Sequence, residues 1–194
     1  MVRARRRHDP RHGATQDTLQ RGGRACATEV EVGSAVVLTD QQIARLVAEK
    51  KPTVAAPQLL RELQQKSEAI GRSRVAMRKV LAADGGSFFL RVRQNALDPY
   101  DFSIILSYQP KGGSELILRR HNGPSHAHRN AIEDSRFAGV CHIHEATERY
   151  QLRGSRAEHY AEPTDRFHDV ATALACMLID ANFESPDQSP FPGL

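Results

Sequence analysis

Apolar residues recur at helical spacing in the part of the chain that follows residue 38. The TDQQ sequence at 39–42 has the form of a capping box, and Ile43 begins an apolar stripe behind it. This pattern predicts a helix over about 39–51. Pro57 suits the first turn of a second, leucine-rich helix. The RSRVAMRKVLAA sequence at 72–83 allows either a resumed helix or irregular structure.

From Ser87 onward the hydrophobic period changes from helical to two, which is typical of half-buried strands. The segments that alternate in this way are 87–94, 101–109, 114–121 and 140–146. The PKGG sequence between the second and third segments predicts a hairpin. A last helix, capped by Thr164, is predicted over 164–182 from its single apolar stripe. We therefore expect an α+β fold whose four-stranded, mostly antiparallel sheet packs on the C-terminal helix and on one or two N-terminal helices.

Side chains alternate between the two faces of a strand, so each predicted strand can be sorted by parity. One face receives the large apolar residues, among them Phe88, Leu90 and Ile104. The opposite face is expected to collect arginines and histidines from several strands. These are Arg91, Arg93, Arg119, His121, His142 and His144. Such a face is too cationic for an apolar cover without partners, so it predicts either solvated surface or a binding site.

Five of the nine histidines lie between residues 119 and 150, and four of them form two His-x-His pairs. A pair of imidazoles can supply a general acid and a general base, and arginine can bind phosphate through two hydrogen bonds. We therefore predict an RNA- or phosphate-directed activity. If the protein is an enzyme, we expect a metal-independent ribonuclease without a cofactor. The predicted catalytic residues are His126, His128, His142, His144 and Arg119. The predicted binding residues are Arg91, Arg93, His121, Asn122, Arg129 and Arg149.

Two alternatives remain open for the same residues. Imidazoles two residues apart on a strand point the same way, which suits a transition metal in a metal-dependent hydrolase. In this alternative His126 and His128 complete four ligands, or Glu145 or Glu148 joins them. The surrounding arginines disfavour a cation, so this alternative ranks below phosphate. The other alternative is a binding module without catalysis, whose arginine- and histidine-rich face receives a partner.

The basic charge of the chain is concentrated at its N-terminus. Of the 27 basic and 23 acidic residues, seven arginines and two aspartates lie within residues 1–24, so the rest of the chain is nearly neutral. The global charge therefore does not itself indicate nucleic-acid binding. Because the first residues show no hydrophobic period, we expect a disordered basic tail over 1–33, a single α+β domain over 34–185 and a flexible C-terminal tail over 186–194.

Cysteine usage and hydropathy favour a cytoplasmic protein. The three cysteines are odd in number and far apart, which argues against a disulfide framework. No apolar run approaches the roughly 20 residues that cross a bilayer, and the N-terminus lacks the apolar core of a signal peptide. We therefore expect no membrane partner.

Several motifs resemble an uncharacterised bacterial domain family. The FFLRVRQ and DFSIILSY strands precede the ILRRHNGPSHAHRN loop and the CHIHEATERYQ strand, as in a family with a Gly-x-x-His loop and a later His-x-His strand. The chain is also distantly similar to the TumE family of toxin–antitoxin toxins. The resemblance covers about 39–185 and implies a small prokaryotic α+β protein with an antitoxin-like partner. It rests on the motif residues Arg119, Asn122, Gly123, His126, His128, His142 and His144.

Overall fold

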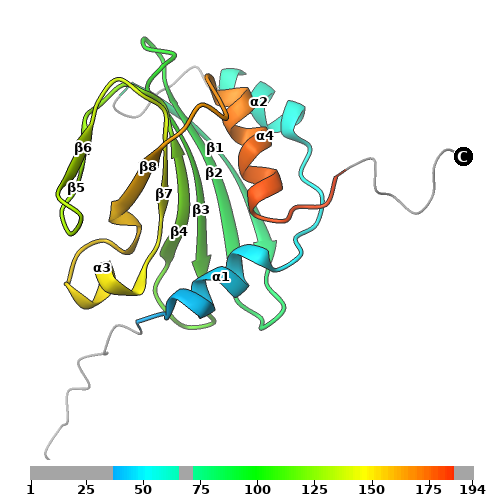
Figure 1. Cartoon of the computed structure of the whole chain (residues 1–194). Helices are drawn as coiled ribbons and strands as arrows, with labels where there is room; N and C mark the ends of the chain where they lie inside the picture. The colour runs from blue at the N-terminus through cyan, green and yellow to red at the C-terminus, as the bar shows by residue number, and fades with distance from the viewer. Residues whose placement is uncertain (1–36, 66–71, 186–194) are drawn as a thin grey trace, which may run out of the picture. The chain divides into compact units, whose positions relative to one another are not determined.

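A six-stranded antiparallel sheet forms the centre of the computed structural model, which describes residues 37–65 and 72–185 (Figure 1). The strand order is β1-β2-β3-β4-β7-β8. The strands are β1 (Ser73–Leu81), β2 (Ser87–Asn95), β3 (Phe102–Gln109), β4 (Leu116–Asn122), β7 (His142–Glu145) and β8 (Tyr160–Pro163). A separate two-stranded hairpin consists of β5 (His128–Asn130) and β6 (Ser135–Phe137). The α+β class and the antiparallel pairing are confirmed, but the sheet has six strands and not four. The tails predicted over 1–33 and 186–194 lie outside the described residues.

The two strands that the sequence did not predict are those at the edges of the sheet. The segment expected to be helical or irregular forms β1, which pairs with β2 along its whole length. The apolar residues of this segment fit a helical period and a strand period equally well. Pairing with β2 makes it a strand, in which Ala76 and Val80 are buried and Met77 is exposed. At the other edge, β8 pairs with β7.

Three helices cover one face of the sheet (Figure 1). They are α1 (Asp40–Ala48), α2 (Ala56–Gln65) and α4 (Val170–Asp180). The capping box of α1 is present, since the Thr39 side chain accepts from the Gln42 amide. The last helix begins later than predicted, because Asp169 and not Thr164 caps it through the Thr172 amide. The irregular segment before Asp169 places Phe167 in the core.

The core lies between these helices and the sheet. Phe88, Leu90, Ile104 and Leu106 on the sheet are almost fully buried against residues such as Leu174. Each such side chain stabilises the fold by roughly 1.5–3 kcal/mol relative to an exposed one. The opposite face carries the shorter α3 (Glu148–Leu152), the 3-10 turn η1 (Ala157–His159) and the β5–β6 hairpin near its β7–β8 end (Figure 1). None of the helices in the described ranges is long and apolar enough to cross a membrane.

One buried lysine ties the ends of two helices together. The Lys51 ammonium donates to the carbonyl oxygens of Leu46, Val47 and Glu49 at 3.0, 2.9 and 2.7 Å, and to that of Ala181 at 2.9 Å. It also lies 4.4 Å from the centre of the Phe88 ring. Burial lowers the pKa of Lys51 to about 8. These contacts join the C-terminal end of α1 to that of α4.

A β-bulge in β4 changes which side chains reach each face. Leu106 pairs with Arg119, but the next residue, Ser107, pairs with Ile117, so Leu118 is an extra residue in β4. The parity of the strand is therefore inverted beyond Leu118. As a correction to the parity expected from the sequence, Arg119 and His121 lie on the helix-covered face, and Arg120 and Asn122 lie on the other.

Candidate functional site

Five histidines from three parts of the chain gather on the face of the sheet opposite the helices. His142 and His144 come from β7, His126 from the segment before β5, His128 from the start of β5, and His159 from η1. Ring centroids are 5.0 Å apart for His142 and His144, 4.7 Å for His128 and His144, 4.9 Å for His126 and His142, and 5.4 Å for His128 and His159. This set, the histidine cluster, unites the four histidines predicted to be catalytic and adds His159.

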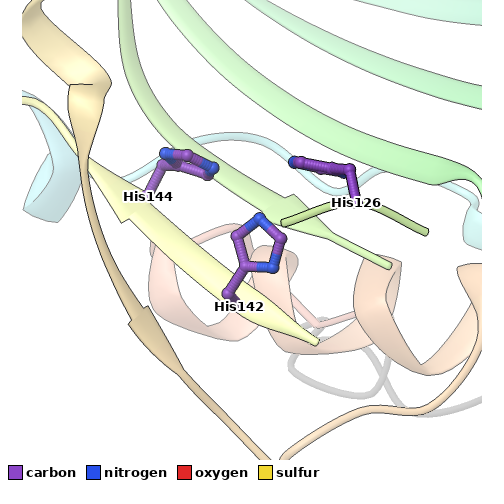
Figure 2. Close-up of side chains that lie close together, drawn as sticks. All are labelled: His126, His142 and His144. Atoms are coloured by element: carbon purple, nitrogen blue, oxygen red, sulfur yellow. The ribbon is translucent and has the colours of Figure 1, made fainter. Parts of the chain in front are cut away.

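The alternation of β7 explains the direction of two of these rings. Ile143 points into the core, so its neighbours His142 and His144 both point to the opposite face, where they pair with Asn122 and Arg120 of β4. In Figure 2 a ring nitrogen of each of His126, His142 and His144 faces a common space. The parity predicted for the His-x-His pair of this strand is therefore confirmed.

Backbone carbonyls fix the tautomers of the two buried rings. Nδ1 of His142 lies 3.0 Å from the Val140 oxygen, and Nδ1 of His144 lies 2.9 Å from the Glu158 oxygen. A carbonyl oxygen only accepts, so each Nδ1 carries the hydrogen and each Nε2 keeps its lone pair. Nε2 of His142 has the Asn122 side-chain nitrogen at 3.4 Å. Within the described part of the chain, Nε2 of His144 is buried and has no hydrogen-bond partner.

Burial keeps these two imidazoles neutral. His142 is fully buried and His144 is 7% exposed. Desolvation, reinforced by neighbouring histidines and by Arg120, lowers the pKa of His142 to about 4 and that of His144 to about 2. Both rings therefore present an uncharged Nε2 to the cluster at neutral pH.

The β5–β6 hairpin supplies a third oriented ring. The Asn130 side chain is held by Ala161, donating to its oxygen at 2.7 Å and accepting from its amide at 2.9 Å. The same Asn130 oxygen lies 3.0 Å from Nε2 of His128, which therefore donates. Burial lowers the pKa of His128. His126, in contrast, is exposed.

A cleft of about 370 Å³ opens beside the cluster and is lined by His126, His128, His144 and His159. We call it the histidine cleft. Its charged lining consists of Arg120, Arg129, Arg156 and Glu158. Arg120 forms a 2.9 Å ion pair with Glu158, and Arg129 a 2.6 Å pair with the exposed Asp134. Arg156 forms no ion pair with the described residues. The lining therefore has a net positive charge, which favours an anionic ligand.

Several predicted site residues lie elsewhere. Arg119, predicted to be catalytic, forms ion pairs with Glu145 and, at 3.8 Å, with Asp180 on the helix-covered face. His121 is fully buried there and stacks on Phe167 with ring centroids 5.2 Å apart. The bulge at Leu118 is the physical reason for both displacements.

The remaining predicted binding residues divide into two groups. Asn122 and Arg129 line the cleft. Arg91, Arg93 and Arg149 do not line it and are paired with Glu115, Asp101 and Glu133 respectively. Sequence reasoning missed Arg120, Arg156, Glu158 and His159. Without the bulge, the parity of β4 would place Arg120 on the opposite face, away from the cleft. The segment that carries the other three residues has no hydrophobic period that would predict its structure.

Comparison with known proteins gives no relative: no protein-family model, no curated protein and no solved structure matches the chain. The likeness to the TumE family therefore stays a prediction from motifs.

Proposed function

We propose that the histidine cleft binds a phosphate group of RNA and cleaves the ester beside it. The observation that carries this proposal is the shared lining of the cleft, in which four imidazoles adjoin Arg120, Arg129 and Arg156. Arginine recognises phosphate oxygens through paired N–H donors, and imidazole is the side chain suited to proton transfer near neutral pH. The cleft volume lies in the range of ordinary ligand sites.

RNA provides its own nucleophile for this reaction. The 2′-hydroxyl oxygen forms a bond to the adjacent phosphorus as a base removes its proton, and the 5′-oxygen leaves as an acid returns a proton to it. The products are a 2′,3′-cyclic phosphate and a free 5′-hydroxyl. A neutral imidazole on the cleft wall acts as the base, and the arginines balance the charge that develops on the phosphoryl oxygens.

The test uses one oligonucleotide sequence as RNA and as DNA. Purified protein should cleave the RNA and leave the DNA intact, with a cyclic phosphate as the first product. His128→Ala and Arg156→Gln should each slow cleavage by at least about 100-fold. His168→Ala and Arg153→Gln are matched controls, because both side chains are exposed and lie outside the cleft lining. Equal cleavage by all four variants would exclude the cleft as the reacting site.

A partner surface is supported by the exposed edge strand β1. Val75, Met77 and Leu81 are spaced by even numbers of residues, so they share one face of the strand, and they are 39%, 46% and 76% exposed. We assign this surface to the antitoxin-like partner. If expression of the chain arrests growth and co-expression of the neighbouring gene's product relieves it, Met77→Asp should abolish the relief. Relief that survives this substitution would place the partner elsewhere.

A further inference from the structure

Three imidazoles of the histidine cluster are close enough to share one ion. One ring nitrogen from each of His126, His142 and His144 lies within 4.8 Å of the other two (Figure 2). Zn–N bonds of about 2.0–2.1 Å in tetrahedral geometry place the nitrogens about 3.3 Å apart. His126 is exposed on the segment before β5, so its ring has room to move towards the two buried rings.

The two buried rings are already held as metal ligands usually are. In metal sites the ring nitrogen that does not bind the ion donates to a carbonyl or carboxylate, which fixes the tautomer. Here the Val140 and Glu158 carbonyls accept from Nδ1 of His142 and His144. The metal-binding form of imidazole is the neutral one, which binds through the ring nitrogen that carries no hydrogen, here Nε2. Both side chains therefore have the required tautomer.

An unsatisfied polar atom points into the same space. Nε2 of His144 belongs to a side chain more than nine-tenths buried and has no hydrogen-bond partner among residues 37–65 and 72–185. Buried polar groups without partners are rare in folded proteins, and each calls for a specific explanation. An ion bound among the three rings would give this lone pair its partner.

Arg120 lies beside the buried rings, but its repulsion of a bound cation is reduced by an ion pair. Arg120 pairs with the buried Glu158 at 2.9 Å, so its charge is balanced beside His144. A second set, His121, Cys176 and Asp180, also has the spacing of metal ligands. Its carboxylate, however, already accepts two hydrogen bonds from Arg166 at 2.6 and 2.9 Å. Of the two sets in the described residues, the His126 set is the one without a carboxylate already engaged by arginine, and it includes the unpartnered Nε2 of His144.

We propose that His126, His142 and His144 bind one divalent transition-metal ion of the zinc class. Three neutral nitrogens leave a fourth position for water at the histidine cleft, which is the arrangement of catalytic and not structural zinc sites. Such an ion lowers the pKa of its water towards 7 and supplies hydroxide at neutral pH. The inference goes beyond the RNA-cleaving function and does not rest on it, since the ligand geometry is independent of the substrate.

The experiment is a metal titration of the tag-free full chain after treatment with a chelator. Zn²⁺ should bind in one equivalent, measured by competition with a chromogenic chelator and by elemental analysis after gel filtration. Co²⁺ should give the intense visible absorption of a four-coordinate nitrogen site. Absence of a stoichiometric site for either ion would overturn the proposal.

Variants locate the site. His126→Ala removes an exposed ligand and leaves the core untouched, so it should weaken Zn²⁺ binding by on the order of 100-fold or more, because even loss of a group that orients a ligand costs about 10–100-fold. His142→Gln and His144→Leu should do the same, with folding checked by circular dichroism. His168→Ala, a matched exposed histidine, should bind as the unmodified chain does. Unchanged affinity in His126→Ala would refute the assignment.

The two proposals fail separately. Metal-free protein that cleaves RNA at full rate and binds no ion would overturn the metal site and retain the ribonuclease. Stoichiometric, His126-dependent Zn²⁺ binding without cleavage of RNA by the metal-loaded protein would retain the metal site and overturn the ribonuclease.

Discussion

His144 and His121 lie on neighbouring strands of one sheet and are both buried, but they point to opposite faces and differ in what their rings contact. Nδ1 of His144 donates to a backbone carbonyl, and its Nε2 has no partner in the described residues. Nδ1 of His121 lies 3.3 Å from the Ala173 oxygen, and its Nε2, which also makes no hydrogen bond within these residues, lies 3.4 Å from the Asp180 carboxylate. The difference between the two rings is the carboxylate beside the second nitrogen of His121, which has no counterpart beside Nε2 of His144 among the described residues.

The His121 face is organised around one carboxylate. Asp180 accepts from Arg166 through both oxygens and lies 3.8 Å from Arg119. Burial alone would raise the pKa of Asp180, but the contacts with His121, Arg166 and Arg119 outweigh it and hold the pKa well below its ordinary value. The histidine cluster has no carboxylate among its three converging ligands. One face therefore holds a carboxylate paired with cations, and the other holds uncharged imidazoles, of which His144 has an Nε2 without a partner in the described ranges.

The largest effect is expected from removal of the shared carboxylate. Asp180→Ala leaves His121, Arg119 and Arg166 without their common partner, which should lower the free energy of unfolding by about 3–5 kcal/mol at pH 7. Urea denaturation measures this loss. Asp165→Ala is the matched control, because Asp165 is exposed. A loss of under about 1 kcal/mol would mean that the network does not stabilise the fold.

The second-largest effect is expected in the pH dependence of stability, because the two faces should lose stability in different pH ranges. His142 and His144 have folded-state pKa values of about 4 and about 2, below the unfolded value of about 6.5. The unfolded chain therefore binds more protons below pH 6.5, and stability falls as pH drops from 6.5 towards 4. Between pH 7 and pH 5 the loss should be on the order of 2 kcal/mol per histidine.

The Asp180 network loses stability in a lower window. Since the pKa of Asp180 is depressed, its contribution is present above the ordinary pKa of about 3.9 and is lost only as pH falls below it. Urea denaturation at pH 7 and pH 5 should show a smaller loss in His144→Leu than in the unmodified chain, and an unchanged loss in His168→Ala. Identical losses in all three proteins would contradict the assignment of His144.

A matched pair of apolar substitutions tests the comparison directly at pH 7. His121→Leu removes the 3.4 Å contact of Asp180 with the imidazole and leaves the Ala173 oxygen without its partner, so it should lower the free energy of unfolding by about 1–3 kcal/mol. His144→Leu removes a buried nitrogen that has no partner, which offsets the loss of its Nδ1 bond, and metal-free protein should change by less than about 1 kcal/mol. Equal losses of unfolding free energy in the two variants would contradict the proposed difference between His121 and His144.

The smallest effect concerns Arg129, whose ion pair with Asp134 is exposed. Asp134 has a positive φ of 51°, which asparagine tolerates, so Asp134→Asn frees Arg129 without straining the turn. Stability should change by less than about 0.5 kcal/mol. RNA binding should become tighter at low salt, because a freed cation near the cleft is attracted to phosphate. Filter binding at two salt concentrations measures the change, and weaker binding would contradict it.

The sequence predicted the features that depend on local pattern. The capping box at Thr39 and the shared face of His142 and His144 follow from spacings of three and two residues. The bulge at Leu118 could not be predicted, because it depends on how β3 and β4 align. The strand β1 and the turn that carries Glu158 and His159 depend in the same way on neighbours distant in sequence. Local spacing was therefore enough to predict the histidines of the site, whereas the arginines beside them depend on tertiary strand pairing.

The buried ammonium of Lys51 gives the fold a chemical reporter. Its four carbonyl contacts leave it 1% exposed, so an amine-reactive reagent cannot reach it while the ends of α1 and α4 stay joined. The rate of acylation of this one lysine, followed by mass spectrometry, would therefore report how often the ends of the two helices separate. The neighbouring Lys50, 71% exposed in its side chain, would react at once and serve as the internal clock.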